Sequence, residues 1–244
     1  MNWVLSNSDT IWSATLAHLA IALPAIVLAF LLSIPVGWLV ARLRGSQSEN
    51  TTAKNLAQGT GGGLVAVASL LYAVPSLPLL IVIPGILGTD LQSPVNVVVG
   101  MTVYGMALMV RSTADALASV DKGTVAAAVA MGYSPVQRFF RVELPLAGPV
   151  LLAGLRVVTV STISLTTVGA VLGVENLGSL FTDGIARDIP AEIIAGIVVV
   201  LVIVFVLDGL LVLLGRAVLP WSVSPSAGAQ RRARRALETT EVAS

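Results

Sequence analysis

The chain has 244 residues, of which 56% are hydrophobic and only 11% are charged, and its formal net charge is +1. The charged fraction is well below the roughly 25% of a soluble domain, which excludes a chain that exposes most of its residues to water. Cysteine is absent, so disulfides and thiolate chemistry are excluded, and the single histidine cannot form a multi-histidine metal site. We expect this residue, His18, to be interfacial because it lies near the start of the first apolar run.

Five apolar runs are long enough to cross the roughly 30 Å hydrocarbon core of a bilayer, which takes about 20 helical residues. The runs are too long for the strands of a membrane barrel, so they predict an all-α membrane protein with about five transmembrane helices. The predicted spans are 17–41, 63–87, 94–113, 148–171 and 192–218.

Lysine and arginine predict the orientation of the chain. Of the 14 basic residues, all but Arg187 fall in alternate connections or at their borders. The positive-inside rule therefore places the N-terminus outside and the C-terminus in the cytoplasm. The predicted organisation is an extracellular segment at 1–16, a transmembrane domain at 17–220 and a basic cytoplasmic tail at 221–244.

The second run, LLYAVPSLPLLIVIPGILG, contains three prolines that weaken the helical hydrogen-bond ladder. We expect this helix to bend or break near Pro75, Pro78 and Pro84. A break at membrane depth is tolerated only against protein or beside a water-filled cavity. Both interpretations are open: an ordinary kink packed on neighbouring helices, or a wall of a polar pathway.

Polar residues also occur inside the last two runs. Thr159, Thr162 and Thr166 share one helical face, where small hydroxyl side chains suit either close helix packing or a polar pathway. Asp208 lies well inside the fifth run, and an ionisable group at that depth is costly and suggests function. It could line a pathway, accept a proton or pair with a residue such as Arg156.

The connection between the third and fourth runs has strong local signals. Asp121 is a plausible helix N-cap ahead of KGTVAAAVAM, and Gly132 suits the left-handed conformation that ends a helix. Ser134 and Pro135 then start a second helix at roughly 135–142. We expect Pro145 to stop that helix before the next span. Such a rigid projection suits docking in a cleft of a partner, although it could also be an amphipathic cover on the bundle that attracts anionic lipid.

This connection resembles the coupling loop of ATP-binding-cassette (ABC) importer permeases. In that family a Glu-Ala-Ala motif is followed, after three intervening residues, by glycine and, after nine more, by an aliphatic residue, a variable position and Leu-Pro. The matching positions keep every spacing and are Ala126, Ala127, Ala128, Gly132, Val142, Leu144 and Pro145. The departure is Ala126, where the family usually has glutamate. Ser134, Pro135 and Phe139 are included in the predicted ATPase-coupling set.

Two further stretches, AVPSLPLLIVIPGILG and GVENLGSLFTDGI, are similar to permeases for osmoprotectants such as glycine betaine, carnitine, choline and proline betaine. The resemblance implies a type I importer of the MetI-like permease fold in a prokaryotic cell membrane. It implies no catalytic or metal site in this chain. Residues of the expected translocation pathway are Tyr72, Pro75, Ser76, Tyr104, Thr159, Thr162, Thr166 and Asp208.

The chain lacks the G-x-x-x-x-G-K-[ST] loop of an ATPase, so ATP and magnesium are expected on separate subunits. The other implied partners are an external binding protein, a second permease chain and membrane lipid, with no nucleic acid. The second chain can be identical, although alanine at position 126 favours a heterodimer whose other chain keeps the glutamate. Alternative functions are import of another small solute such as methionine, or an ATP-independent gated channel.

Overall fold

The structure is a computed structural model that describes residues 2–44, 59–64, 66–67, 70 and 72–222. The described residues form helices and turns, as the apolar runs predict. The basic tail from residue 223 onward lies outside them. In chain order the helical elements are α1 (Asn2–Ser6), α2 (Ser8–Arg44), α4 (Ser76–Leu87), α5 (Pro94–Ala118), α6 (Lys122–Ala130), α7 (Pro135–Arg138), η1 (Phe139–Glu143), α8 (Leu144–Thr166), η2 (Thr167–Leu172), α9 (Ser179–Ala186), α10 (Pro190–Val218) and η3 (Pro220–Ser222).

Four helices in the described part of the chain are long and apolar enough to cross a membrane: Ser8–Arg44, Pro94–Ala118, Pro135–Leu172 and Pro190–Val218. They correspond to the first, third, fourth and fifth predicted spans and confirm an all-α membrane protein. The first of them begins at Ser8, well before the expected start at residue 17.

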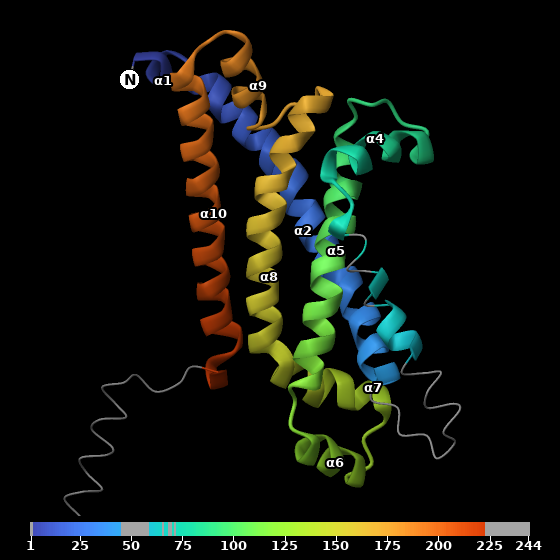
Figure 1. Ribbon diagram of the computed structural model, residues 1–244. Coiled ribbons are helices and arrows are strands. Elements are labelled where there is room, and N and C mark those ends of the chain that lie inside the picture. The colour runs from blue at the N-terminus through green and yellow to red at the C-terminus, as the bar shows by residue number, and fades with distance from the viewer. Residues whose placement is uncertain (1, 45–58, 65, 68–69, 71, 223–244) are drawn as a thin grey trace, which may run out of the picture.

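The second predicted span, 63–87, is not one long helix. Described residues between 59 and 73 are helical, the backbone leaves the helix at Val74 and Pro75, and α4 begins at Ser76. The break predicted from the prolines is thus present. With 12 residues, α4 is too short to cross a bilayer alone. In Figure 1 it lies across the end of α5 instead of running beside it.

Helix α5 packs against both α2 and α8, and α2 runs obliquely behind these two helices in Figure 1. Glycines allow these helices to approach closely, as small residues do in membrane proteins. A Cβ atom added at Gly37 of α2 would lie 2.5 Å from Cβ of Thr113, and one at Gly105 of α5 would lie 2.6 Å from Cβ of Ala29. Larger side chains at these positions would therefore separate the helices.

Pro145 does not stop a helix, contrary to the prediction. The helical backbone continues from Pro135 through Leu172, and Pro145 is the second residue of α8. The reason is the π-helical turn η1, in which the amide of Leu144 donates to the carbonyl of Phe139, five residues back. This wider turn shifts the hydrogen-bond register next to the proline, which has no amide proton to donate.

His18, which is expected at the membrane interface, is fully buried within the bundle. Its Nε2 lies 3.1 Å from the carbonyl oxygen of Ile163 and donates to it, which ties α2 to α8. Because α2 begins at Ser8, His18 lies almost three turns inside the helix.

The bundle has two distinct ends (Figure 1). Helices α6 and α7 project from one end, next to the last residues of α2 and α10. Helices α1, α4 and α9 cover the other end. The projecting helices α6 and α7 and the helices that cover the other end are therefore on opposite sides of the molecule.

Candidate functional site: the coupling segment and the transport pathway

The coupling segment, residues 121–145, begins with a capped helix. The carboxylate of Asp121 accepts hydrogen bonds from the backbone amide of Thr124 at 2.8 Å and from its hydroxyl at 3.1 Å. Gly132 has φ +80°, the left-handed conformation predicted for the end of this helix. The amide of Tyr133 donates to the carbonyl of Ala128 at 3.2 Å across that turn. Both ends of α6 are therefore fixed by local hydrogen bonds.

The second helix starts with a reciprocal capping box. The amide of Gln137 donates to Oγ of Ser134 at 3.3 Å, and the amide of Ser134 donates to Oε1 of Gln137 at 3.0 Å. Pro135 is the first helical residue, as predicted. The two short helices are thus separated only by the turn around Gly132, and each begins with a capping side chain.

Phe139 of the coupling segment and Trp38 and Arg42 of α2 anchor the segment to the bundle. Phe139 is only 5% exposed, and its ring centroid lies 5.3 Å from that of Trp38 and 4.9 Å from that of Phe140. The guanidinium of Arg42 lies 4.3 Å from the Trp38 ring, and its Nη2 donates to the carbonyl of Pro135 at 3.2 Å. Sequence reasoning treated Arg42 only as a topology signal, because Pro135 lies 93 residues away along the chain.

An internal ion pair lies beneath the same segment. Arg138 pairs with the buried carboxylate of Glu143. Both residues line a hollow of about 760 Å³ that also includes Arg42, Lys122 and Ala126. Ala126, where the resemblance to importer permeases implies a glutamate, thus faces a basic region. Glu143 supplies the carboxylate that pairs with a cation there.

The outer surface of the coupling segment carries exposed apolar side chains. Val129, Met131, Val136 and Phe140 are each more than half exposed, at 53%, 68%, 57% and 61%. Five other residues of the predicted ATPase-coupling set are also exposed: Ala126, Ala127, Gly132, Ser134 and Pro135. In contrast, Ala128 is buried, and Val142, Leu144 and Pro145 are partly buried. Exposed large apolar side chains on a rigid projection favour a protein partner.

The Asp121 cap gives a direct test of the coupling segment. Replacing Asp121 with alanine should fray the first turn of α6, whereas asparagine should keep the cap. Hydrogen bonds from Thr124 lower the pKa of the Asp121 carboxyl below its ordinary value. The carboxylate cap is therefore complete above the ordinary value and is lost only as the pH falls through the lowered pKa. Amide hydrogen exchange at 122–126 should rise in Asp121→Ala and stay low in Asp121→Asn at neutral pH.

Four predicted pathway residues come together at the break before α4. The hydroxyl of Tyr104 donates to the carbonyl of Val74, at the point where the backbone leaves the helix. The rings of Tyr72 and Tyr104 meet edge to face with centroids 6.0 Å apart. Pro75 and Ser76 follow directly in the chain. Tyr104 is buried, whereas 45% of the Tyr72 residue surface remains exposed.

The threonines of α8 lie between helices. Thr159, Thr162 and Thr166 are 3%, 2% and 0% exposed, and the hydroxyl of Thr166 donates to the carbonyl of Thr162 at 2.7 Å. Their burial within one chain supports the close-packing interpretation. The hydroxyl side chain that α8 leaves exposed is Ser164.

Asp208 forms the ion pair with Arg156 that was one of its expected alternatives. Arg156 Nε and Nη2 donate to the two carboxylate oxygens at 2.6 and 2.7 Å. This two-pronged geometry is the strongest form of an arginine–carboxylate contact. The pair joins α8 to α10 and lies apart from the tyrosine pair, which belongs to α5 and the break before α4.

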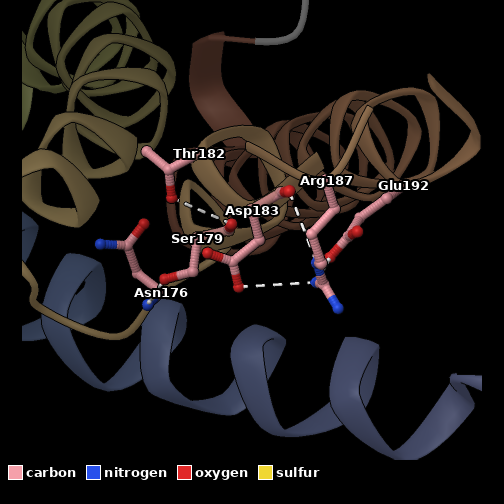
Figure 2. Close-up of polar contacts among 6 residues, drawn as sticks. All are labelled: Asn176, Ser179, Thr182, Asp183, Arg187 and Glu192. Atoms are coloured by element: carbon pink, nitrogen blue, oxygen red, sulfur yellow. Dashed lines mark hydrogen bonds and ion pairs between the residues drawn. The ribbon is translucent and has the colours of Figure 1, made fainter. Parts of the chain in front are cut away.

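The end of the bundle opposite the coupling segment holds a second polar network (Figure 2). Arg187 Nη2 lies 2.6 Å from Oε1 of Glu192 and 3.7 Å from Oδ2 of Asp183. Glu192 is fully buried at the start of α10. The side chain of Asn176 accepts from the amide of Gly178 at 2.6 Å and donates to the carbonyl of Val174 at 2.9 Å, which folds the turn before α9. Sequence reasoning used the charged residues of this network only to count loop charges.

The sequence of the chain is similar to those of known transport proteins. The family model described as "Binding-protein-dependent transport system inner membrane component" matches residues 60–220. The chain is 26% identical over 220 residues to the choline transport system permease protein OpuBB of Bacillus subtilis (strain 168), covering 90% of this chain and 94% of the relative. It is 28% identical over 214 residues to the osmoprotectant import permease protein OsmW of Salmonella typhimurium (strain LT2), covering 86% and 93%.

A solved structure has the same fold. It is described as an inward-facing conformation of the MetNI methionine ABC transporter, and it superimposes with a TM-score of 0.75 at 21% identity over 87% of this chain and 98% of that one. The fold is therefore MetI-like, and the family model spans the coupling segment and three of the four long helices. The chain belongs to the binding-protein-dependent transport system inner membrane component family, the bacterial inner-membrane permeases of ABC importers, whose ATP is hydrolysed on separate subunits.

Proposed function

We propose that this permease imports osmoprotectants of the quaternary-amine class, such as glycine betaine, carnitine, choline or proline betaine. The observation that carries the solute class is the similarity to choline and osmoprotectant permeases along nearly the whole chain. A quaternary ammonium has no N–H to donate and is attracted electrostatically to aromatic faces and to polar oxygens. The Tyr72–Tyr104 pair and the neighbouring carbonyls at the broken helix offer such groups.

The coupling segment is the proposed contact with the ATPase. Its two capped helices, its exposed apolar tip and its anchors on Trp38 and Arg42 would transmit movement of a bound ATPase into α2 and α8. The basic residues near this end, including Arg44, Arg111 and Arg141, favour a cytoplasmic position for it under the positive-inside rule. The end with α9 would then face outward, toward the binding protein.

A second permease chain completes the proposed transporter. Within one chain most of α10 remains exposed; Phe205, Leu213 and Val218, for example, are 73%, 59% and 57% exposed. Alanine at position 126 favours a non-identical second chain that keeps the glutamate. The two chains would rock about a central pathway, which is alternating access driven by the ATPase.

Uptake by the reconstituted complex tests the proposed solute. The permease, its ATPase and its binding protein would be placed in proteoliposomes with ATP supplied on the ATPase side, and uptake of radiolabelled glycine betaine would be measured. We expect ATP-dependent uptake that excess choline, carnitine or proline betaine reduces and excess methionine does not. Uptake of methionine alone would replace the osmoprotectant proposal with the methionine alternative.

A further inference from the structure

The ion pair between α8 and α10 lies deep within the membrane-spanning part of the chain. Arg156 is the thirteenth of the 23 residues of α8, and Asp208 is the nineteenth of the 29 residues of α10. Each is therefore several turns from the nearer end of its helix. Charged groups at this depth face protein or a water-filled cavity because lipid tails cannot solvate them.

The pair is not enclosed by its own chain. The side chain of Arg156 is 41% exposed and that of Asp208 is 29% exposed. Both line a hollow of about 350 Å³ whose other walls are Ala153, Val157, Val160 and Ser161. This volume lies within the roughly 300–1,000 Å³ of small-molecule sites. Two ionised and partly exposed side chains therefore border a hollow at a depth where contact with lipid tails would be unfavourable for them.

The other side of α10 has the opposite character. Val206, Leu210 and Leu213 are all more than half exposed and entirely apolar, as expected of a lipid-facing surface. Val206 precedes Asp208 by two residues, which at about 100° per residue places it on nearly the opposite side of the helix. The charge of Asp208 is thus on the side of α10 that faces the hollow beside α8.

We propose that this hollow opens to the water-filled pathway of the assembled transporter and that Arg156 and Asp208 form a transient binding site for a zwitterionic solute. This proposal rests on the proposed import of osmoprotectants and assigns two residues that bind the solute. The carboxylate of a betaine would bind the Arg156 guanidinium, and its quaternary ammonium would lie beside Asp208. One internal ion pair would be exchanged for two with the solute. A quaternary ammonium cannot donate a hydrogen bond, so its attraction to Asp208 is electrostatic alone and allows release.

Cysteine accessibility tests the hollow, because the chain has no native cysteine. Val157 lines the hollow and is 59% exposed, and Val206 on the other side of α10 is 54% exposed, so Val157→Cys and Val206→Cys are matched variants. In the reconstituted complex with cysteine-free partners, a quaternary-ammonium thiosulfonate should label Val157→Cys at least ten-fold faster than Val206→Cys. Glycine betaine delivered with ATP and binding protein should slow that labelling. Equal slow labelling would overturn the aqueous hollow, and labelling that betaine leaves unchanged would overturn the solute site.

A second variant separates solute binding from a purely structural ion pair. In Arg156→Met/Asp208→Leu both charges are replaced together by apolar side chains, so neither is left unpaired; such replacements often preserve folding. Uptake of glycine betaine should fall at least ten-fold in complexes that still co-purify with the ATPase. Unchanged uptake would overturn the solute site. If the double variant does not assemble, the labelling of Val157→Cys and Val206→Cys with and without glycine betaine tests the solute site alone. Uptake by the unmodified complex tests the osmoprotectant function separately, since the difference in labelling between the two cysteines does not depend on it.

Discussion

Replacing Gly132 with valine should abolish uptake and solute-stimulated ATP hydrolysis in the reconstituted transporter. Gly132 has φ +80°, a conformation that costs ordinary L-residues about 1–2 kcal/mol and β-branched residues more. A Cβ atom added there would meet no atom within 4 Å beyond its chain neighbours, so the effect would come from the backbone and not from a clash. The turn would change, and α6 would no longer be held at its angle to α7. A decrease of at least ten-fold in both activities is expected.

The matched control for this prediction is Gly132→Asn. Asparagine adopts the left-handed conformation more readily than other non-glycine residues, so this variant should keep most of the uptake. Thermal unfolding of both variants should resemble that of the unmodified protein, because the turn is exposed. If Gly132→Val retained full uptake and stimulated ATP hydrolysis, the coupling role of this turn would be wrong.

Replacing Arg187 with methionine should destabilise the end of the bundle that carries α9. Glu192 is fully buried, and Oε1 pairs with Arg187 at 2.6 Å, while Oε2 has no hydrogen-bond partner among the described residues. Removing one member of a buried pair usually costs about 3–5 kcal/mol; because Arg187 is 54% exposed we expect about 2–3 kcal/mol in the free energy of unfolding. The thermal midpoint of the detergent-purified protein measures the change.

Arg187→Met/Glu192→Gln separates charge from packing. Glutamine has nearly the same shape as glutamate without the charge, so the double variant should recover most of the lost stability. Equal unfolding temperatures for the single and double variants would show that the buried charge is not the cause. Because the network lies far from the coupling segment, ATP hydrolysis by complexes that remain folded should change less than in Gly132→Val.

Local signals predicted the coupling segment best. The N-caps at Asp121 and Ser134, the left-handed turn at Gly132 and the break near Pro75 each depend on a few neighbouring residues, and all are present in the structure. The pairing of Asp208 with Arg156 could be offered only as one of several alternatives, since it depends on how α8 and α10 are rotated against each other.

Contacts between distant segments account for much of what the sequence did not predict. The burial of His18 was not predicted, because its partner, the Ile163 carbonyl, lies 145 residues away. Pro145 was expected to end a helix, but the π-helical turn before it absorbs the missing hydrogen bond. The role of Arg42 as an anchor and the burial of Glu192 likewise follow from packing, for which one sequence gives no direct signal.

The unbroken helical path from Pro135 to Leu172 has a mechanical consequence. Its 38 residues extend about 57 Å at 1.5 Å per residue, so a tilt of about 10° at one end would swing the other by about 10 Å. The π-helical turn at Phe139–Glu143, which has more residues per turn than an α-helix, lies within this continuous helix and follows α7 directly. A small tilt imposed at the projecting helices can thus move the opposite end of this helix by about 10 Å without unfolding any part of it.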